Sequence, residues 1–268
     1  MQGPGQASNV GLIPRAMKPI FRTLLLCLIP LSLLHAQEKE VADAPKHPHE
    51  VAFSNLPEAK RKEFTEKLNE SRRLFGEKRV FEALDKAKEA SAIFPDDPGL
   101  VNLIGACHVE FRNFDKAMEC FKKADSLTPD NAEIVFNIAE LNFVTKNWEE
   151  AERTLTRVLE LAPASNKTQF QLSRLTEFKL LLVKLKLNKA AEAATMAEKY
   201  DYLDDSPYPY YAEAAIHFSK GKEMEAEAAM ARAGRIFQDP NAVAPWQDTM
   251  IEFGYVKGFF GGDEAESK

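Results

Sequence analysis

The chain has 268 residues, of which 45% are hydrophobic and 28% are charged, and it contains 18 Phe, 12 Gly and 15 Pro. This apolar content supports a folded core, so disorder along the whole length is excluded, and the low Gly content excludes collagen-like and Gly-rich chains. The net charge is −6, and an acidic balance argues against binding to a nucleic-acid backbone, which requires clustered Lys and Arg.

The N-terminal segment predicts export. Residues 17–22 form a basic stretch, residues 23–34 form an apolar run, and Ala36 then supplies a small residue for cleavage. This order is typical of a secretory signal peptide, and the run is shorter than the ~20 residues that a membrane-spanning helix needs. We expect residues 1–36 to be a signal peptide, with the true start at Met17, and the protein to be periplasmic or secreted. The alternative is an uncleaved segment that anchors the chain in the membrane.

Two further segments are expected to lie outside the folded core. Residues 37–54 are charged, contain Pro and show no apolar period, so we expect a flexible linker. Residues 261–268 are expected to be a disordered tail. Without residues 1–36 the chain has 32 basic and 41 acidic residues, which gives a net charge of −9.

Between these segments, side chains of the same kind recur every 34 residues. One column holds Ala83, Ala117 and Ala151. Four further columns hold a small residue (Ser71, Gly105, Ala139), a large apolar residue (Val80, Phe114, Trp148), Ala or Val (Ala90, Ala124, Val158) and Pro (Pro95, Pro129, Pro163). The small residue and the Ala that follows it 12 positions later let two helices approach closely, and Pro ends the second helix. Each unit is therefore predicted to be a hairpin of two helices that buries its apolar face by stacking on its neighbours.

This pattern resembles the tetratricopeptide repeat (TPR) family. The resemblance covers three regular repeats at 64–97, 98–131 and 132–165, a divergent unit at 166–205, and a unit at 207–240 that keeps Ala214, Ala226 and Ala233. It implies an all-α fold, namely a TPR-like α-solenoid of about five helix–turn–helix hairpins in a right-handed superhelix over residues 55–260. The apolar stretch 242–260, which contains Trp246 and Phe259, is expected to be a C-terminal capping helix.

The resemblance also implies where partners bind. In this family the first helices of successive hairpins line a concave groove that binds peptides or partner proteins. Positions counted from the small column predict the groove residues Asn102, Phe136, Glu140, Phe143, Tyr208, Tyr211 and Phe218. The aromatic side chains would supply contact area, with Asn102 and Glu140 as polar anchors. The alternative is that some of the aromatic side chains pack under the next hairpin or under the C-terminal helix.

A clamp for a peptide carboxylate, which one subgroup of the family makes with Lys and Asn, is not predicted. Glu133 stands at an expected Lys position, and Leu103 stands at an expected Asn position. Glu residues in the groove instead favour a neutral or basic ligand. Asn137 either holds the backbone of a ligand or bonds within its own helix.

The sequence shows no catalytic or metal-binding pattern, so we expect neither an enzyme nor a cofactor. His47 and His49 lie in the predicted linker without a third metal ligand nearby. Cys107 and Cys120 fall on the two helices of one hairpin, and their close-packed surroundings favour two buried thiols over the disulfide that export would permit.

We therefore predict an exported, non-enzymatic TPR scaffold that recognises a peptide or partner protein in its concave groove. Nucleic acid is not an expected partner, the membrane is one only if the N-terminal segment stays uncleaved, and the oligomeric state is left open. The alternative function is a structural subunit of a membrane-attached envelope assembly that docks through the C-terminal helix around Trp246 and Phe259. An enzyme that uses the groove as a substrate channel has no support in the sequence.

Overall fold

The computed structural model describes residues 47–162 and 167–257. The predicted signal peptide, Pro163, Phe259 and the predicted tail lie outside these ranges. Within them the chain forms twelve helices and no strand. Ten of the helices pair as hairpins 1 to 5: α2 (Glu58–Gly76) with α3 (Val80–Ser91), α4 (Pro98–Glu110) with α5 (Phe114–Leu127), α6 (Ala132–Val144) with α7 (Trp148–Leu161), α8 (Lys167–Lys186) with α9 (Ala190–Ala197), and α10 (Tyr208–Ser219) with α11 (Glu223–Ile236). The short α1 (Pro48–Ser54) precedes them, and α12 (Pro240–Phe253) follows them.

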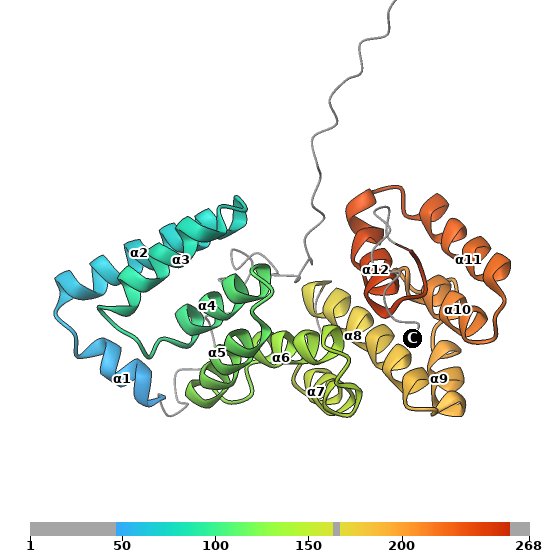
Figure 1. Cartoon of the computed structure of the whole chain (residues 1–268), viewed down its shortest axis with the longest axis horizontal. Coiled ribbons are helices and arrows are strands. Elements are labelled where there is room, and N and C mark those ends of the chain that lie inside the picture. Colours follow the sequence, from blue (N-terminus) through green and yellow to red (C-terminus); the bar gives the residue numbers. More distant parts are fainter. Residues whose placement is uncertain (1–46, 163–166, 258–268) are drawn as a thin grey trace, which may run out of the picture.

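The hairpins stack in chain order along an arc (Figure 1). Hairpin 1 lies at one end of the arc and hairpin 5 at the other, and α12 lies on the inner side, next to α8 and α10. This arrangement confirms the predicted fold class, an all-α TPR-like solenoid of five hairpins with an additional C-terminal helix. We call the side of the arc on which α12 lies the inner face.

The residues of the repeating columns make the helix contacts that their sizes predict. The small residues and their Ala partners are fully or almost fully buried in every regular hairpin. Ser71 Oγ donates a hydrogen bond of 2.7 Å to the carbonyl oxygen of Ala83 on the partner helix. A Cβ atom added at Gly105 would lie 2.6 Å from the ring of Phe121, so only glycine fits there without displacing the ring. Close helix approach within a hairpin therefore depends on these positions.

All five hairpin turns share a conformation that the sequence columns did not reveal. The turn residues Lys78, Arg112, Lys146, Asn188 and Gly221 have φ angles of 63°, 55°, 61°, 59° and 69°. The next residue in each turn donates its N–H to a carbonyl five residues earlier, as from Arg79 to Leu74 at 2.9 Å. This is the Schellman ending of a helix, for which glycine is the favoured residue. Four of the five turns therefore hold a side chain in a left-handed conformation that costs roughly 1 kcal/mol.

Two ends of the predicted solenoid differ from the structure. The prediction of a flexible linker through residue 54 is wrong for residues 48–54, which form α1. Phe53 of α1 packs against Phe64 and Phe94 of hairpin 1, with ring centroids 5.3 and 5.4 Å apart. The two ring contacts of the half-buried Phe53 attach this segment to hairpin 1. A single aromatic residue does not produce an apolar period within seven residues, so the sequence pattern did not reveal the helix. At the other end, α12 stops at Phe253 because Gly254 adopts φ 91°.

Candidate partner-binding face

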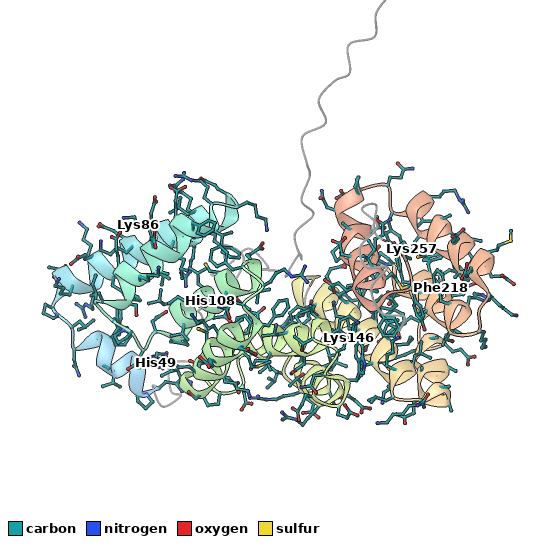
Figure 2. All side chains as sticks on the ribbon, viewed as in Figure 1. His49, Lys86, His108, Lys146, Phe218 and Lys257 are labelled. Atoms are coloured by element: carbon teal, nitrogen blue, oxygen red, sulfur yellow. The ribbon has the colours of Figure 1, made fainter. Side chains whose placement is uncertain are left out.

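The residues predicted to line an open groove are mostly buried. Asn102, Phe136, Glu140, Phe143, Tyr208 and Tyr211 are each at most 5% exposed. Phe218 is half-buried and stacks on Tyr255 with ring centroids 5.1 Å apart. Figure 2 places Phe218 near Lys257 at the C-terminal end of the molecule, opposite Lys86 of hairpin 1. The expectation that these side chains face solvent is wrong for all but Phe218, whereas their role in partner binding stays a prediction.

The C-terminal helix accounts for most of this burial. Trp246 of α12 packs against Phe178, Tyr211 and Tyr208, with ring centroids 5.4, 5.8 and 6.3 Å apart. One helical face of α12 thus covers side chains from α8 and α10. A helix that capped only hairpin 5 would not contact α8. The alternative stated above, in which the aromatic residues pack under the C-terminal helix, is therefore correct for Tyr208 and Tyr211.

Phe253, the last residue of α12, reaches back to hairpin 3. Its ring lies 6.1 Å from that of Phe143 and 5.7 Å from that of Trp148. The Nζ of Lys186 on α8 lies 4.6 Å from the same ring centroid, within the range of a cation–π contact. The inner face of hairpins 3 to 5 is therefore filled by this chain's own helix.

A buried ion cluster joins α6, α8 and α12. Lys179 Nζ of α8 lies 3.1 Å from Glu140 Oε2 of α6 and 3.2 Å from Glu252 Oε2 of α12. The three side chains are 3%, 6% and 12% exposed. Burial raises the pKa of Glu140, Lys179 opposes this, and Glu252 adds to it. Burial alone would lower the pKa of Lys179, but the two carboxylates outweigh it and raise that pKa. Two acids thus share one ammonium group in a site with little water.

A row of polar side chains joins the first helices of hairpins 1 to 3, and its hydrogen bonds in the described ranges involve no residue of α12. Asn137 Nδ2 of α6 donates to Asn102 Oδ1 of α4 at 2.9 Å, and Asn102 Nδ2 donates to Glu133 Oε1 at 3.3 Å. Asn137 therefore bonds to the neighbouring hairpin and not within its own helix. Burial raises the pKa of Glu133, and Arg72 opposes this. We call Arg72, Asn102, Glu133 and Asn137 the polar row.

Arg72 is the exceptional member of the polar row. It is half-buried, and burial lowers its pKa against the attraction of Asp97 and Glu133. A Cβ atom at Gly99 would lie 2.9 Å from Arg72 Nη2, so Gly99 leaves the space that the guanidinium group occupies. Within residues 47–162 and 167–257, Arg72 makes no hydrogen bond or close ion pair. A guanidinium group carries five N–H donors. The counting rule used above reached only first helices of later hairpins, so Arg72 was missed.

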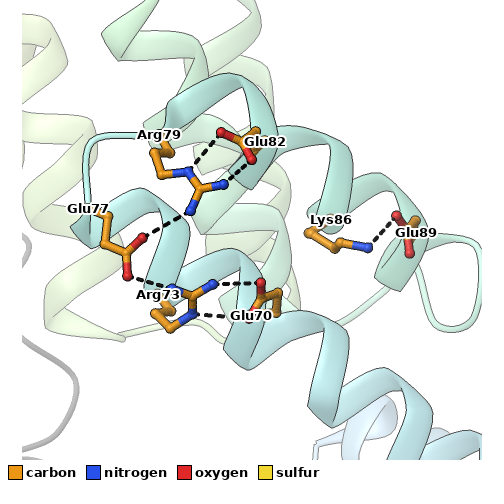
Figure 3. Close-up of polar contacts among 7 residues, drawn as sticks. All are labelled: Glu70, Arg73, Glu77, Arg79, Glu82, Lys86 and Glu89. Carbon is orange, nitrogen blue, oxygen red and sulfur yellow. Dashed lines mark hydrogen bonds and ion pairs between the residues drawn. The ribbon is translucent and has the colours of Figure 1, made fainter.

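Exposed charges on hairpin 1 form a different kind of network (Figure 3). Arg73 bridges Glu70 at 2.8 Å and Glu77 at 2.5 Å, Arg79 pairs with Glu82, and Lys86 pairs with Glu89 at 2.8 Å. These side chains are 38–57% exposed. Exposed pairs of this kind contribute ~0–1 kcal/mol each, so this network adds little to the stability of hairpin 1.

Neither the cysteines nor the potential metal ligands form a reactive site in the described ranges. Cys107 is buried and Cys120 half-buried, and both are free thiols. Burial raises the pKa of Cys107 to about 12, which makes its thiol unreactive near neutral pH. No cluster of three potential metal ligands occurs among the residues that the structure describes.

The stacked helical hairpins make this chain a TPR-like α-solenoid. Residues 112–171 match the tetratricopeptide repeat family model. A comparison with curated proteins finds no match. Several solved TPR structures have the same fold as this chain at low sequence identity.

Three of these solved structures illustrate the likeness. The Pseudomonas aeruginosa protein pilF is 16% identical, with a TM-score of 0.52, over 74% of this chain and 94% of its own. A thermophilic TPR protein from Thermus thermophilus is 18% identical, with a TM-score of 0.50, over 70% of this chain and 99% of its own. YrrB, described as a TPR protein with an unusual peptide-binding site, is 15% identical, with a TM-score of 0.50, over 74% of this chain and 96% of its own. At these identities the likeness establishes the fold alone.

Proposed function

We propose that this protein is an exported scaffold that holds a peptide segment of a partner protein on the inner face of hairpins 1 to 3. The observation that carries the proposal is the contrast within that face. The aromatic part is filled by α12, with Trp246 2% exposed, whereas the polar row lies outside the contact of α12 and contains an Arg without a bonding partner in the described ranges. Surfaces with spare, partly desolvated donors are suited to ligand recognition.

The chemistry of the polar row predicts the kind of segment that binds. Arg72 can donate to a carbonyl or carboxylate oxygen, and a bidentate pair with a carboxylate would be the stronger contact. Glu133 lies nearby and can accept an N–H or pair with a Lys of the ligand. Asn137 donates to Asn102, and Asn102 donates to Glu133, so these bonds hold the row in register. A short polar segment with both signs of charge fits this surface.

Export is supported by the order of basic, apolar and small residues in positions 17–36. None of the helices in the described ranges is long and apolar enough to cross a membrane. N-terminal sequencing of the protein purified from its native host tests the proposal. A start at Gln37 or close to it supports cleavage and export. An intact start at Met17 would contradict cleavage and favour the anchored form.

Site-specific crosslinking tests partner binding. A photoreactive residue at Asn69, an exposed position of α2 in the same repeat register as Asn137, faces the proposed surface. The matched control carries the photoreactive residue at Lys122, an exposed position on the second helix α5. We expect a discrete protein adduct from position 69 that is lost when Arg72→Ala is added. Identical adducts from both positions, or an adduct that Arg72→Ala leaves unchanged, would contradict the proposed surface.

The alternative of an envelope assembly docked through the C-terminal helix is less well supported. Trp246, its proposed centre, is 2% exposed, and Met250 and Phe253 are also buried. Phe259 lies outside the described residues. The apolar side chains of α12 are thus already engaged within the chain, so they offer no free docking surface.

A further inference from the structure

The inner face of hairpins 3 to 5 binds α12 as a groove binds a helical ligand. We propose that this face is a helix-binding site that α12 fills in the free protein, and that an amphipathic helix of a partner protein with the same side-chain pattern displaces α12. This site is separate from the polar row of hairpins 1 to 3, so it goes beyond the function proposed above.

The shape of the site follows from the three anchors of α12. Trp246, Met250 and Phe253 stand at positions i, i+4 and i+7 of one helix and are each at most 5% exposed. Their receptor comes from three first helices that are distant in sequence, with Phe143 on α6, Phe178 on α8 and Tyr211 on α10. This is the helix-in-groove mode of recognition, in which anchors at such spacings select a helical and not an extended ligand.

The charge of the site adds a fourth requirement. Glu252, at position i+6, places its carboxylate 3.2 Å from the buried Lys179. Lys179 also lies 4.5 Å from the centroid of the Phe143 ring, so the ammonium group sits inside the apolar receptor surface. A competing helix that reproduces the contacts of α12 carries an acid between its second and third apolar anchors. The partner that fits has an aromatic residue at i, an aliphatic residue at i+4, Asp or Glu at i+6 and an aromatic residue at i+7.

Three features make α12 replaceable. It has no second helix in the described ranges with which to form a hairpin. Pro245 lies inside it, where a proline removes one backbone hydrogen bond. Its docking also places a second carboxylate on Lys179, whereas undocking leaves Glu140 and Lys179 as a balanced pair at 3.1 Å.

The two carboxylates and one ammonium group of this cluster imply that docking of α12 is coupled to protonation of Glu140. In the docked state the charged groups that act on Glu140 are Lys179 of α8 and Glu252 of α12. Glu140 Oε1 is buried and has no hydrogen-bond partner within the described ranges. A proton on this carboxyl removes the excess negative charge, so docking is favoured at lower pH. Glu252→Gln removes the excess charge by itself and should make docking independent of pH.

Two measurements on the full-length chain test the proposal. In the first, hydrogen exchange of the unmodified protein is followed helix by helix. We expect the amides of α12 to exchange at least 10-fold more readily than those of α8 and α10, because α12 leaves without unfolding of the hairpins. If the amides of α12 exchange only together with those of α8 and α10, α12 is a permanent part of the core and the proposal is wrong.

In the second, a fluorescent peptide of residues 238–257 is titrated with the full-length chain and its anisotropy is recorded. We expect binding that tightens at least 10-fold when the chain carries Trp246→Ala and Phe253→Ala. The control peptide with the same two substitutions should not bind. Arg72→Ala in the chain should leave binding unchanged, which separates this site from the polar row. Absence of binding to both chains, with helix content retained in circular dichroism, would refute the proposal.

Discussion

Hairpins 1 and 2 and hairpins 4 and 5 have the same two-helix architecture but differ in what their inner faces carry. In the first pair, Arg72 of α2 lies half-buried beside Gly99 of α4. In the second pair, α8 and α10 present Phe178, Tyr208 and Tyr211, which α12 covers. The same two-helix scaffold therefore forms with either a polar or an aromatic inner face. An aromatic inner face requires a covering element, whereas a polar one can remain in contact with water.

The largest effect that would test this difference is expected for Trp246→Ala. Removal of a buried Trp side chain should lower the free energy of unfolding by ~3–5 kcal/mol, because both its contacts and the volume it fills are lost. The control is Phe81→Ala at the other end of the solenoid, where the ring is 76% exposed and should contribute less than ~1 kcal/mol. Urea unfolding measures both. Equal losses for the two variants would mean that α12 adds nothing to the C-terminal half.

The pH dependence of stability gives the next largest effect. Burial and Glu252 raise the pKa of Glu140 to about 7 in the folded state, from its ordinary value of 4.5. Between these values the folded state holds more protons than the unfolded state, so stability falls as pH rises from 4.5 to 7. The expected loss is on the order of 2–4 kcal/mol.

Urea unfolding at about pH 5, 6, 7 and 8 measures this loss, and Glu140→Gln is the matched variant that should remove it. Other groups also titrate in this range. One of them is His108, whose pKa is lowered by burial and by neighbouring Lys residues. The difference between the wild-type and variant curves isolates Glu140. Parallel curves for the two proteins would show that the buried cluster does not take up a proton.

A substitution in the close-packing column should have a smaller effect. Gly105→Ala places a methyl group 2.6 Å from the Phe121 ring and should cost ~1–3 kcal/mol, since an overpacked core must shift. Gly234→Ala in α11 is the control, because a Cβ atom there meets nothing within 4 Å. It should instead stabilise the helix by ~0.5–1 kcal/mol. Thermal unfolding of both proteins should therefore give shifts of opposite sign.

The smallest effect is expected in the turns, where hairpin 3 has Lys and hairpin 5 has Gly at the equivalent left-handed position. Lys146 has φ 61° in hairpin 3, and Gly221 has φ 69° at the equivalent turn of hairpin 5. Lys146→Gly should stabilise the protein by ~0.5–1 kcal/mol, because glycine adopts this conformation without strain. Gly221→Ala should destabilise it by a similar amount. A destabilised Lys146→Gly variant would show that the lysine side chain contributes more than its backbone costs.

The repeat columns could be predicted because their physics is local. Ser71 and Ala83, or Gly105 and Phe121, touch within one hairpin, so their sizes recur with the period of the hairpin. The polar row could be predicted only in part. Asn102 was expected on the inner face. The role of Arg72 depends on the space that Gly99 leaves for its guanidinium group and on the lack of a bonding partner in the described ranges, and the spacing of residues shows neither.

The sequence by itself determined the hairpin architecture, the register of the small and large columns and the presence of an apolar C-terminal helix. Tertiary structure decided which inner-face side chains remain free. Glu252 meets Lys179 across 73 positions of the chain, and the predicted aromatic groove is closed by that return of α12. Contacts between neighbouring helices repeat with the sequence and can be detected in it. A single terminal helix docks once, through the complementarity of surfaces that no period relates.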